Sequence, residues 1–312
     1  MRYYMGIDVG SVSTNLVLLD DNGNLKFSEY IRTHGNPLGS VQEALAKVHL
    51  PKGVRIAGVG VTGSARYLIA AMVGADVVKN EITAHAVAST RIHPDARTII
   101  EIGGQDSKII ILNDGIVSDF AMNNVCAAGT GSFLDQQASR LGIPIEQFGE
   151  RALKSKTEVR IAGRCTVFAE SDMVHKQQLG FSTDDIINGL CEALVRNYLS
   201  TVGKGKDIKS PILFQGGVAA NKGIHKAFSK YLKKDIIIPK NFAVMGAIGA
   251  ALLAIEEKPK KTKFKGFGIA KLDFKTKSFV CKDCPNNCEV VEFWEDSTII
   301  AHFGDKCGKY DR

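Results

Sequence analysis

The strongest indication of the fold lies in residues 4–20, YMGIDVGSVSTNLVLLD. An apolar strand over 3–9 carries Asp8 near its end, and a turn at Gly10 leads into a second strand over 15–19. Glycine lets backbone amides approach an anion closely, and a neighbouring carboxylate can hold a hydrated magnesium ion. The segment therefore predicts the first strands of a sheet, joined by a turn that suits a phosphate.

The pattern of this segment occurs twice. A second copy begins with a strand over 97–102, has the turn Glu101-Ile102-Gly103-Gly104, and continues through a hairpin at Asn113-Asp114-Gly115. The repeat predicts two similar α/β lobes with a ligand cleft between them. The other expected strands are 25–31, 54–61, 108–112, 116–120, 211–215 and 235–239. The expected helices are 37–49, 64–73, 80–92, 131–141, 221–232 and 243–255, and the middle, 145–200, is expected to be helical, with a long helix over 183–202.

Polar side chains and a third glycine pair extend this interpretation. Gln105 and Asp106 follow the second turn, where they are expected to orient or activate a water aimed at a γ-phosphate. Gly216 and Gly217 follow a strand and precede a helix that contains Asn221, an arrangement that suits a nucleoside. Any one of the three turns alone fits a plain strand-end turn equally well. Three in this order favour a nucleotide site.

Two other phosphate-binding patterns are less well supported. The P-loop pattern is absent, whereas Gly58, Gly60 and Gly63 match G-x-G-x-x-G between a strand and a helix, and Glu81 lies about twenty residues later. A dinucleotide fingerprint usually opens a βαβ run, but this strand is the fourth of its lobe. A structural strand-to-helix turn is favoured, with a nicotinamide or flavin site as the alternative.

Five segments together resemble the activator ATPases of 2-hydroxyacyl-CoA dehydratases, a group that includes ATPase subunits of benzoyl-CoA reductases and reductases of double-cubane cluster proteins. The segments are GIDVGSVSTNLVLLD, EIGGQDSK, NNVCAAGTGSFLDQQASRLG, GRCTVFAESDM and ILFQGGVAANKGI, within residues 3–256. The resemblance implies an α/β, two-lobed actin-like fold, shared with acetate and sugar kinases and heat-shock ATPases, with duplicated ribonuclease H-like lobes. It also implies a homodimer with one 4Fe-4S cluster between its subunits.

The resemblance assigns roles by position. Asp8 is expected near magnesium and, with Gln105 and Asp106, in catalysis. Residues 80–88 and 246–251 resemble the two interlobe connectors. The positions expected to contact ATP, ADP or the cluster are Gly10, Ser11, Val12, Ser13, Asn15, Gly103, Gly104, Gly129, Thr130, Gly216, Gly217, Val218 and Asn221.

One position departs from the family pattern. Related proteins often have lysine where this chain has Asn15, and asparagine donates a hydrogen bond but carries no charge. ATP hydrolysis is therefore expected to be slow, or to rely on another donor such as Lys108.

Cys126 and Cys165 each precede a helix-like segment. Two thiolates per chain cannot fill the four sites of a 4Fe-4S cluster, but a twofold dimer supplies four. A helix that begins after each cysteine would direct its N-terminal dipole toward the anionic cluster. Buried free cysteines are the alternative, and this is the favoured interpretation of Cys191 in the helix expected at 183–202.

The function that the resemblance implies is electron transfer gated by ATP. A ferredoxin or flavodoxin would reduce the cluster, and ATP would drive a very low-potential electron into a partner iron–sulfur enzyme, which performs the chemistry on the acyl-CoA. ATP can drive this only if it binds the docking conformation better than the resting one. Two alternatives stay open: a small-molecule kinase that phosphorylates an acid or sugar, and a non-catalytic nucleotide-binding assembly protein.

The C-terminal part holds four cysteines in the pattern Cys281-x-x-Cys284-x-x-x-Cys288, followed after eighteen residues by Cys307. Strands over 289–294 and 298–303 are expected to form a hairpin between them. Four thiolates suit tetrahedral zinc or a second Fe–S cluster, and free thiols are the alternative.

Charge and composition narrow the class. The 312-residue chain has a formal charge of +7, and residues 258–277 hold eight lysines against one acid, so the rest is neutral. A basic strap gives little support for a nucleic-acid groove, and it fits a solvated linker or a docking surface for an acidic electron donor. Seven cysteines, with neither a signal-peptide pattern nor a membrane-span pattern, predict a cytoplasmic protein. The expected domains are lobe I (1–95 and 244–256), lobe II (96–243), a basic linker (257–277) and a Cys-rich module (278–312).

Overall fold

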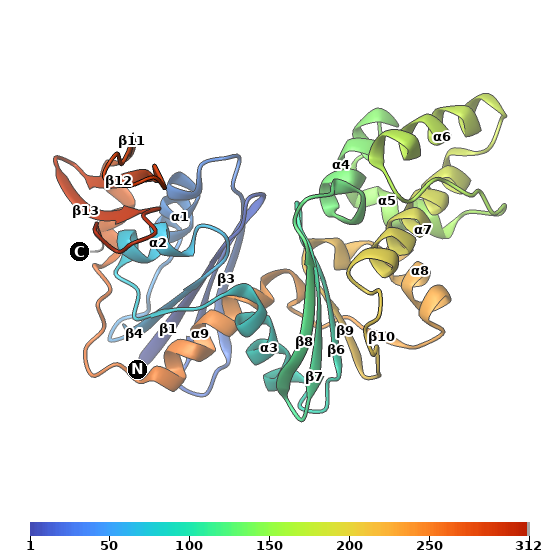
Figure 1. The fold of residues 1–312 in the computed structure, drawn as a ribbon. Helices are drawn as coiled ribbons and strands as arrows, with labels where there is room; N and C mark the ends of the chain where they lie inside the picture. Colours follow the sequence, from blue (N-terminus) through green and yellow to red (C-terminus); the bar gives the residue numbers. More distant parts are fainter. Residues whose placement is uncertain (311–312) are drawn as a thin grey trace. The chain divides into compact units, whose positions relative to one another are not determined.

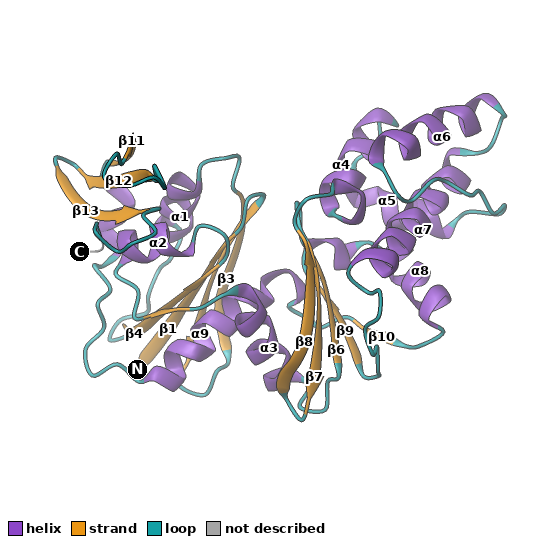
Figure 2. Cartoon of the chain, viewed as in Figure 1, coloured by secondary structure: helices purple, strands orange, loops and turns teal. Residues whose placement is uncertain are grey.

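The computed structural model describes residues 1–310, whose course is shown in Figures 1 and 2. The chain divides into two compact units. Unit 1 contains Met1–Ala84 and the chain from Gly246 onward, and unit 2 contains His85–Met245. Each unit is built around a five-stranded sheet.

The sheet of unit 1 has the strand order β3-β2-β1-β4-β5. The first three strands form an antiparallel meander, and β4 and β5 extend it in parallel. Buried apolar side chains of β1 and β2 pack with those of helices α1 (Pro37–Ala46) and α2 (Arg66–Val73). The strands are β1 (Arg2–Val9), β2 (Ser13–Asp20), β3 (Leu25–Arg32), β4 (Arg55–Thr62) and β5 (Val77–Val78).

The sheet of unit 2 repeats this arrangement in the order β8-β7-β6-β9-β10. Its strands are β6 (Thr98–Ile102), β7 (Ser107–Asn113), β8 (Ile116–Asn123), β9 (Ile212–Gln215) and β10 (Ile236–Ile237). Its helices are α4 (Gly131–Arg140), α5 (Ile145–Leu153), α6 (Thr166–Gln178), α7 (Thr183–Thr201) and α8 (Lys222–Leu232). Helix α7 lies in the centre of this core, with Tyr198 and Leu190 fully buried.

The two sheets therefore have one topology: a three-strand meander followed by two parallel strands. The α/β fold with duplicated lobes, expected from the sequence, is confirmed. Helix α3 (Glu81–Ile92) begins in unit 1 and ends in unit 2, and the side chain of Asn80 accepts the amide of Thr83 at its start (2.9 Å).

Glycines of unit 1 allow helix α9 (Met245–Glu257) to lie directly against the sheet. A Cβ on Gly6 would come within 1.9 Å of the carbonyl oxygen of Ala247, and one on Gly60 within 1.9 Å of that of Ala250. Gly63 has φ +97°, and a Cβ there would meet Val9. The G-x-G-x-x-G match at 58–63 thus provides close packing and a strand-to-helix turn.

The C-terminal segment packs onto unit 1. The 3-10 turn η4 (Phe267–Lys271) contacts α1, and strands β11 (Phe274–Val280), β12 (Glu289–Glu295) and β13 (Thr298–Phe303) form a three-stranded antiparallel sheet. Buried Ile269 and Phe293 join the apolar core of unit 1. Within the range expected to be a linker, the Thr262 hydroxyl and the Lys263 amide donate to Asp76 (2.6 and 2.8 Å).

The helix and strand boundaries agree with the sequence expectation to within a few residues, with two differences. Strand β11 lies partly within the range expected to be a linker. It was not predicted, because its side chains are mostly exposed and its sequence is largely polar. Strand β5, with two residues, is too short to leave a pattern. Among the described residues, no helix has both the length and the apolar character needed to cross a membrane.

Candidate functional site

The first glycine turn lies in unit 1, between β1 and β2. The amide of Gly10 donates to the carbonyl of Ser13 (2.9 Å), which closes the turn. The Thr33 hydroxyl donates to the carbonyl of Gly10 (3.0 Å), and the Thr33 amide donates to that of Val12 (2.8 Å). Because these bonds fix the turn from the β3 side, exposed Ser11 and half-buried Ser13 stay available to a ligand.

Asp8 and Asn15 lie directly opposite each other on β1 and β2. Opposed residues of antiparallel strands carry their side chains on the same face. Asp8 is half-buried and Asn15 is 6% exposed, and the side-chain oxygen of Asn15 has no hydrogen-bond partner among residues 1–310. A buried, unpaired acceptor beside a carboxylate suits a hydrated cation, so these residues fit magnesium.

The second turn lies in unit 2, between β6 and β7. The amide of Gly103 donates to the carbonyl of Asp106 (3.0 Å), and Gln105 is exposed at the tip. Lys108 is only 2% exposed, and its Nζ lies 3.0 Å from Glu101 Oε2 and 2.9 Å from Asp106 Oδ2. This ion-pair network fixes the Asp106 carboxylate at the turn. Lys108, expected as a phosphate donor, is already bound to two carboxylates.

The third turn follows β9, the parallel neighbour of β6. Gly216 has φ +87°, and a Cβ there would lie 2.4 Å from the carbonyl oxygen of Ile102. The side chain of Asn221 accepts the amide of Ile224 (3.1 Å) at the start of α8, while its Nδ2 has no partner in the described chain. The structure thus brings the second and third turns together, with an unused amide donor beside them.

The two cysteines of unit 2 each stand at the start of a helical segment. Cys126 precedes the 3-10 turn η1 (Ala127–Gly129), and Cys165 is the N-cap residue of α6. Both are half-buried, and neither thiol has a hydrogen-bond partner within residues 1–310. Unpaired, half-buried thiols have the chemistry of Fe–S ligands, so each of the two residues fits a cluster ligand. Burial raises the pKa of the Cys191 thiol, which keeps it protonated and suits it to the core.

Exposed apolar side chains lie next to both cysteines in the chain. Val125 is 93% exposed, and Val167 and Phe168, in the first turn of α6, are 65% and 67% exposed. Exposed apolar side chains that gather in a patch mark contact surfaces, and Val167 and Phe168 are neighbours in the chain. The sequence patterns did not identify this feature, because side chains next to a cysteine carry no periodic signal.

The four C-terminal cysteines are not gathered into a metal centre. Among the described residues, no three histidine, cysteine, aspartate or glutamate side chains lie in a group that could hold a metal ion. The amide of Cys281 donates to the carbonyl of Cys288 (2.8 Å), but the Cys281 thiol contacts Asp283 (3.4 Å) and the Tyr310 hydroxyl (3.9 Å). Cys284 and Cys307 are exposed. The residues as placed do not fit a metal.

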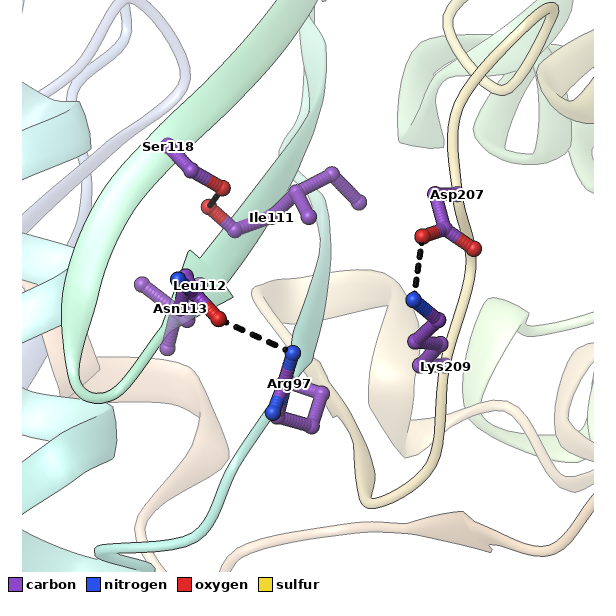
Figure 3. A pocket seen from close by; sticks show the side chains of 7 residues that line it. All are labelled: Arg97, Ile111, Leu112, Asn113, Ser118, Asp207 and Lys209. Atoms are coloured by element: carbon purple, nitrogen blue, oxygen red, sulfur yellow. Dashed lines mark hydrogen bonds and ion pairs between the residues drawn. The ribbon is translucent and has the colours of Figure 1, made fainter.

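A pocket of about 230 Å³ opens in unit 2 (Figure 3). None of the predicted site residues lines it. The guanidinium of Arg97 donates to the side chain of Asn113 (3.1 Å), and Lys209 pairs with Asp207 (2.5 Å). Because its charged groups are already paired, the pocket has no evident part in nucleotide binding.

Comparison with known proteins shows to which family a chain with these turns belongs. Residues 5–254 match the model of the BadF/BadG/BcrA/BcrD ATPase family. The 2-hydroxyisocaproyl-CoA dehydratase activator of Clostridioides difficile is 35% identical over 259 residues, which cover 82% of this chain and 96% of that protein. The activator of lactoyl-CoA dehydratase of Anaerotignum propionicum is 35% identical over 260 residues, covering 83% of this chain and 100% of that protein.

A solved structure agrees with these relatives. The activator of the 2-hydroxyisocaproyl-CoA dehydratase from Clostridium difficile, with bound ADPNP, matches with a TM-score of 0.75 at 34% identity, over 82% of this chain and 95% of that chain. The matches run through both sheets and all three glycine turns. The chain therefore belongs to the BadF/BadG/BcrA/BcrD ATPase family and is a homologue of the ATP-dependent activators of 2-hydroxyacyl-CoA dehydratases.

Proposed function

We propose that this protein is an ATP-driven reductase that passes a very low-potential electron to a partner iron–sulfur enzyme. The partner is a 2-hydroxyacyl-CoA dehydratase, a benzoyl-CoA reductase or a double-cubane cluster protein, and a ferredoxin or flavodoxin supplies the electron. The observation that carries the proposal is the pair Cys126 and Cys165, whose thiols are half-buried, unpaired within the described chain and placed at helical N-termini. Kinases of this fold need no thiolates there.

Each of the three turns would have its own part in binding the nucleotide and its magnesium ion. Asp8 and the side-chain oxygen of Asn15 would accept from magnesium-bound water, while the amides around Gly103 and Gly216 approach the phosphates and the nucleoside. Asp106, fixed by Lys108 (2.9 Å), would orient the attacking water together with Gln105. Asn221 Nδ2 would donate to the nucleoside, because it has no other partner in residues 1–310.

The cysteines would hold a 4Fe-4S cluster shared by two chains. When bound, such a cluster takes up and releases one electron at a time. The exposed apolar residues Val125, Val167 and Phe168 would then be covered by the second subunit or by the partner enzyme. The dipole of α6 behind Cys165 would stabilise the anionic site.

The test is ATP-dependent electron transfer from the chemically reduced protein to an iron–sulfur acceptor protein under anaerobic conditions. Cys126→Ser should abolish the transfer and leave ATP binding largely intact, whereas Cys284→Ser, which removes an exposed C-terminal thiol, should retain it. ATP-dependent phosphorylation of an acid or sugar, with no electron transfer by the wild-type chain, would establish the kinase instead.

A further inference from the structure

The N-terminus of α4 is hydrogen-bonded to the second glycine turn. The amide of Gly131 donates to the carbonyl of Gly103 (2.9 Å), and the amide of Ser132 donates to that of Gly104 (2.8 Å). The Ser132 hydroxyl donates to the same Gly104 oxygen at 2.6 Å. A carbonyl oxygen has two lone pairs, so one serine fills both acceptor sites of Gly104. A movement of this turn must therefore carry the start of α4 with it or break these bonds.

The same end of α4 is joined tightly to Cys126. Thr130 donates to the carbonyl of Ala127 from both its amide (3.0 Å) and its hydroxyl (2.9 Å). The side chain of Asn123 accepts the amide of Cys126 (3.0 Å) and donates to its carbonyl (2.8 Å). The four residues between Cys126 and Gly131 thus have little freedom, and a displacement at Ser132 is passed to the cysteine.

Asn197, on α7, connects this turn to the second cysteine. It is 3% exposed, and its Nδ2 donates to the carbonyl of Gly163 (2.6 Å), two residues before Cys165. Its Oδ1 lies against Gly129, where a Cβ would approach it to 2.8 Å. One buried side chain therefore lies close to both cysteine-bearing segments, bonded to one at Gly163 and packed beside the other at Gly129.

We infer that Ser132 is a positioning residue that transmits nucleotide occupancy of the turn at 103–106 to Cys126 and Cys165. The inference rests on the proposed function for the identity of the ligand. A nucleotide that binds one arrangement of this turn better than another shifts the population of arrangements. Because the Ser132 hydroxyl gives Gly104 its second bond, the start of α4 follows the turn. By reciprocity, a change at the cysteines alters nucleotide affinity by the same factor.

The experiment measures alkylation of Cys126 and Cys165 in the full-length, metal-free chain, resolved by peptide mass spectrometry. Rates are compared without nucleotide and with saturating Mg·AMPPNP. In the wild-type protein, nucleotide should change the alkylation rate of both cysteines by about fivefold or more, since fivefold is the lower end of typical allosteric coupling. Ser132→Val, which keeps the two backbone bonds between α4 and the turn, should move both ratios toward one, and Ser132→Thr, which has the shape of valine but carries a hydroxyl, should restore them. Ser139→Ala, an exposed site in the last turn of the same helix, should behave as wild type.

Two results would overturn the inference. One is a wild-type alkylation rate that is the same with and without bound nucleotide. The other is a rate ratio in Ser132→Val equal to that of wild type. Neither bears on the proposed function, which is judged by iron content and electron transfer. If the protein binds no iron but the alkylation rates still depend on nucleotide and Ser132, the coupling stands and the electron-transfer proposal fails. Ser132→Ala provides a second variant, without β-branching, should Ser132→Val fold poorly.

Discussion

Lys108 shows how single residues determine this site. Its ammonium lies between Glu101 and Asp106, at 3.0 and 2.9 Å, and both Lys108 and Glu101 are buried. Removing one member of a buried ion pair is strongly destabilising, since it leaves its partner uncompensated. The Lys108 network therefore supports the turn mechanically while it fixes the Asp106 carboxylate.

We predict that Lys108→Met lowers the free energy of unfolding by about 3–5 kcal/mol and reduces ATP hydrolysis. The double variant Lys108→Met/Glu101→Gln should regain part of the stability, because the unpaired buried charge is removed. Urea denaturation measures the free energy of unfolding of the single and the double variant, and an ATPase assay measures hydrolysis. Lys209→Met, which removes one partner of an exposed pair with Asp207, should cost less than about 1 kcal/mol. A Lys108→Met loss as small as that of Lys209→Met would contradict this account.

Asn15 provides a second prediction at this scale. Its buried side-chain oxygen is unpaired among the described residues, and it lies opposite Asp8. A lysine at this position would add a positive charge beside the proposed phosphate site, and charge-assisted bonds are stronger than neutral ones. We expect Asn15→Lys to raise kcat/KM for ATP by about tenfold, or about 1.4 kcal/mol. Unchanged ATP affinity and turnover would refute this hypothesis, and Asn15→Met, without the charge, should not show the gain.

At the scale of elements, the contact of α9 with the sheet depends on glycine. A Cβ on Gly60 would lie 1.9 Å from the carbonyl oxygen of Ala250, a distance that real contacts do not reach. We predict that Gly60→Ala lowers unfolding free energy by about 3 kcal/mol, since helix and strand must separate. Gly268→Ala is the matched control because nothing lies within 4 Å of its Cβ position. Thermal denaturation showing equal effects would indicate that the close packing is unimportant.

Asp185, in the first turn of helix α7, makes the stability of unit 2 depend on pH. Hydrogen bonds from the Ser182 hydroxyl and the Thr157 amide, with others from Ser155 and Lys156, hold the pKa of Asp185 well below its usual value. A depressed folded-state pKa gives stability that is present above the ordinary carboxyl pKa of about 4 and is lost as the pH falls below it.

Asp185→Asn should therefore lower the free energy of unfolding by about 2 kcal/mol at pH 7, because it removes charge-assisted bonds. The difference from wild type should shrink as the pH falls from 5 toward 2. Urea titrations across this range measure it, with exposed Asp235→Asn as the control, expected to change stability by less than about 0.5 kcal/mol. A difference that stayed constant with pH would contradict the assignment.

Local sequence patterns predicted most helices and strands, and each feature that they missed has a physical reason. Apolar strands that end in glycine turns leave clear signals, as at Asp8 and Gly103. Strand β11 does not, because its exposed side chains include lysines that are also typical of a linker. Ser132 and Asn197 were missed for another reason: their partners Gly104 and Gly163 lie 28 and 34 residues away, and tertiary hydrogen bonds leave no periodic trace.

For the whole molecule, the duplicated sheet explains how one chain has several glycine turns suited to a phosphate. The same meander turns at Gly10 between β1 and β2 and at Gly103 between β6 and β7, and in each unit helices follow the third strand. Sequence predicted this repeat because both copies end in an acid and a glycine. It did not predict that the segment after residue 256, including Phe293, packs into the core of unit 1, because that contact joins distant parts of the chain.

We propose that Cys126 and Cys165 hold an iron–sulfur cluster between two copies of an ATPase. Iron and acid-labile sulfide should be quantified in the anaerobically purified protein, together with its mass in solution. We expect about four irons and four sulfides per dimer, and we expect Cys126→Ser to lose them. A colourless, iron-free wild-type protein that phosphorylates a small metabolite would contradict it.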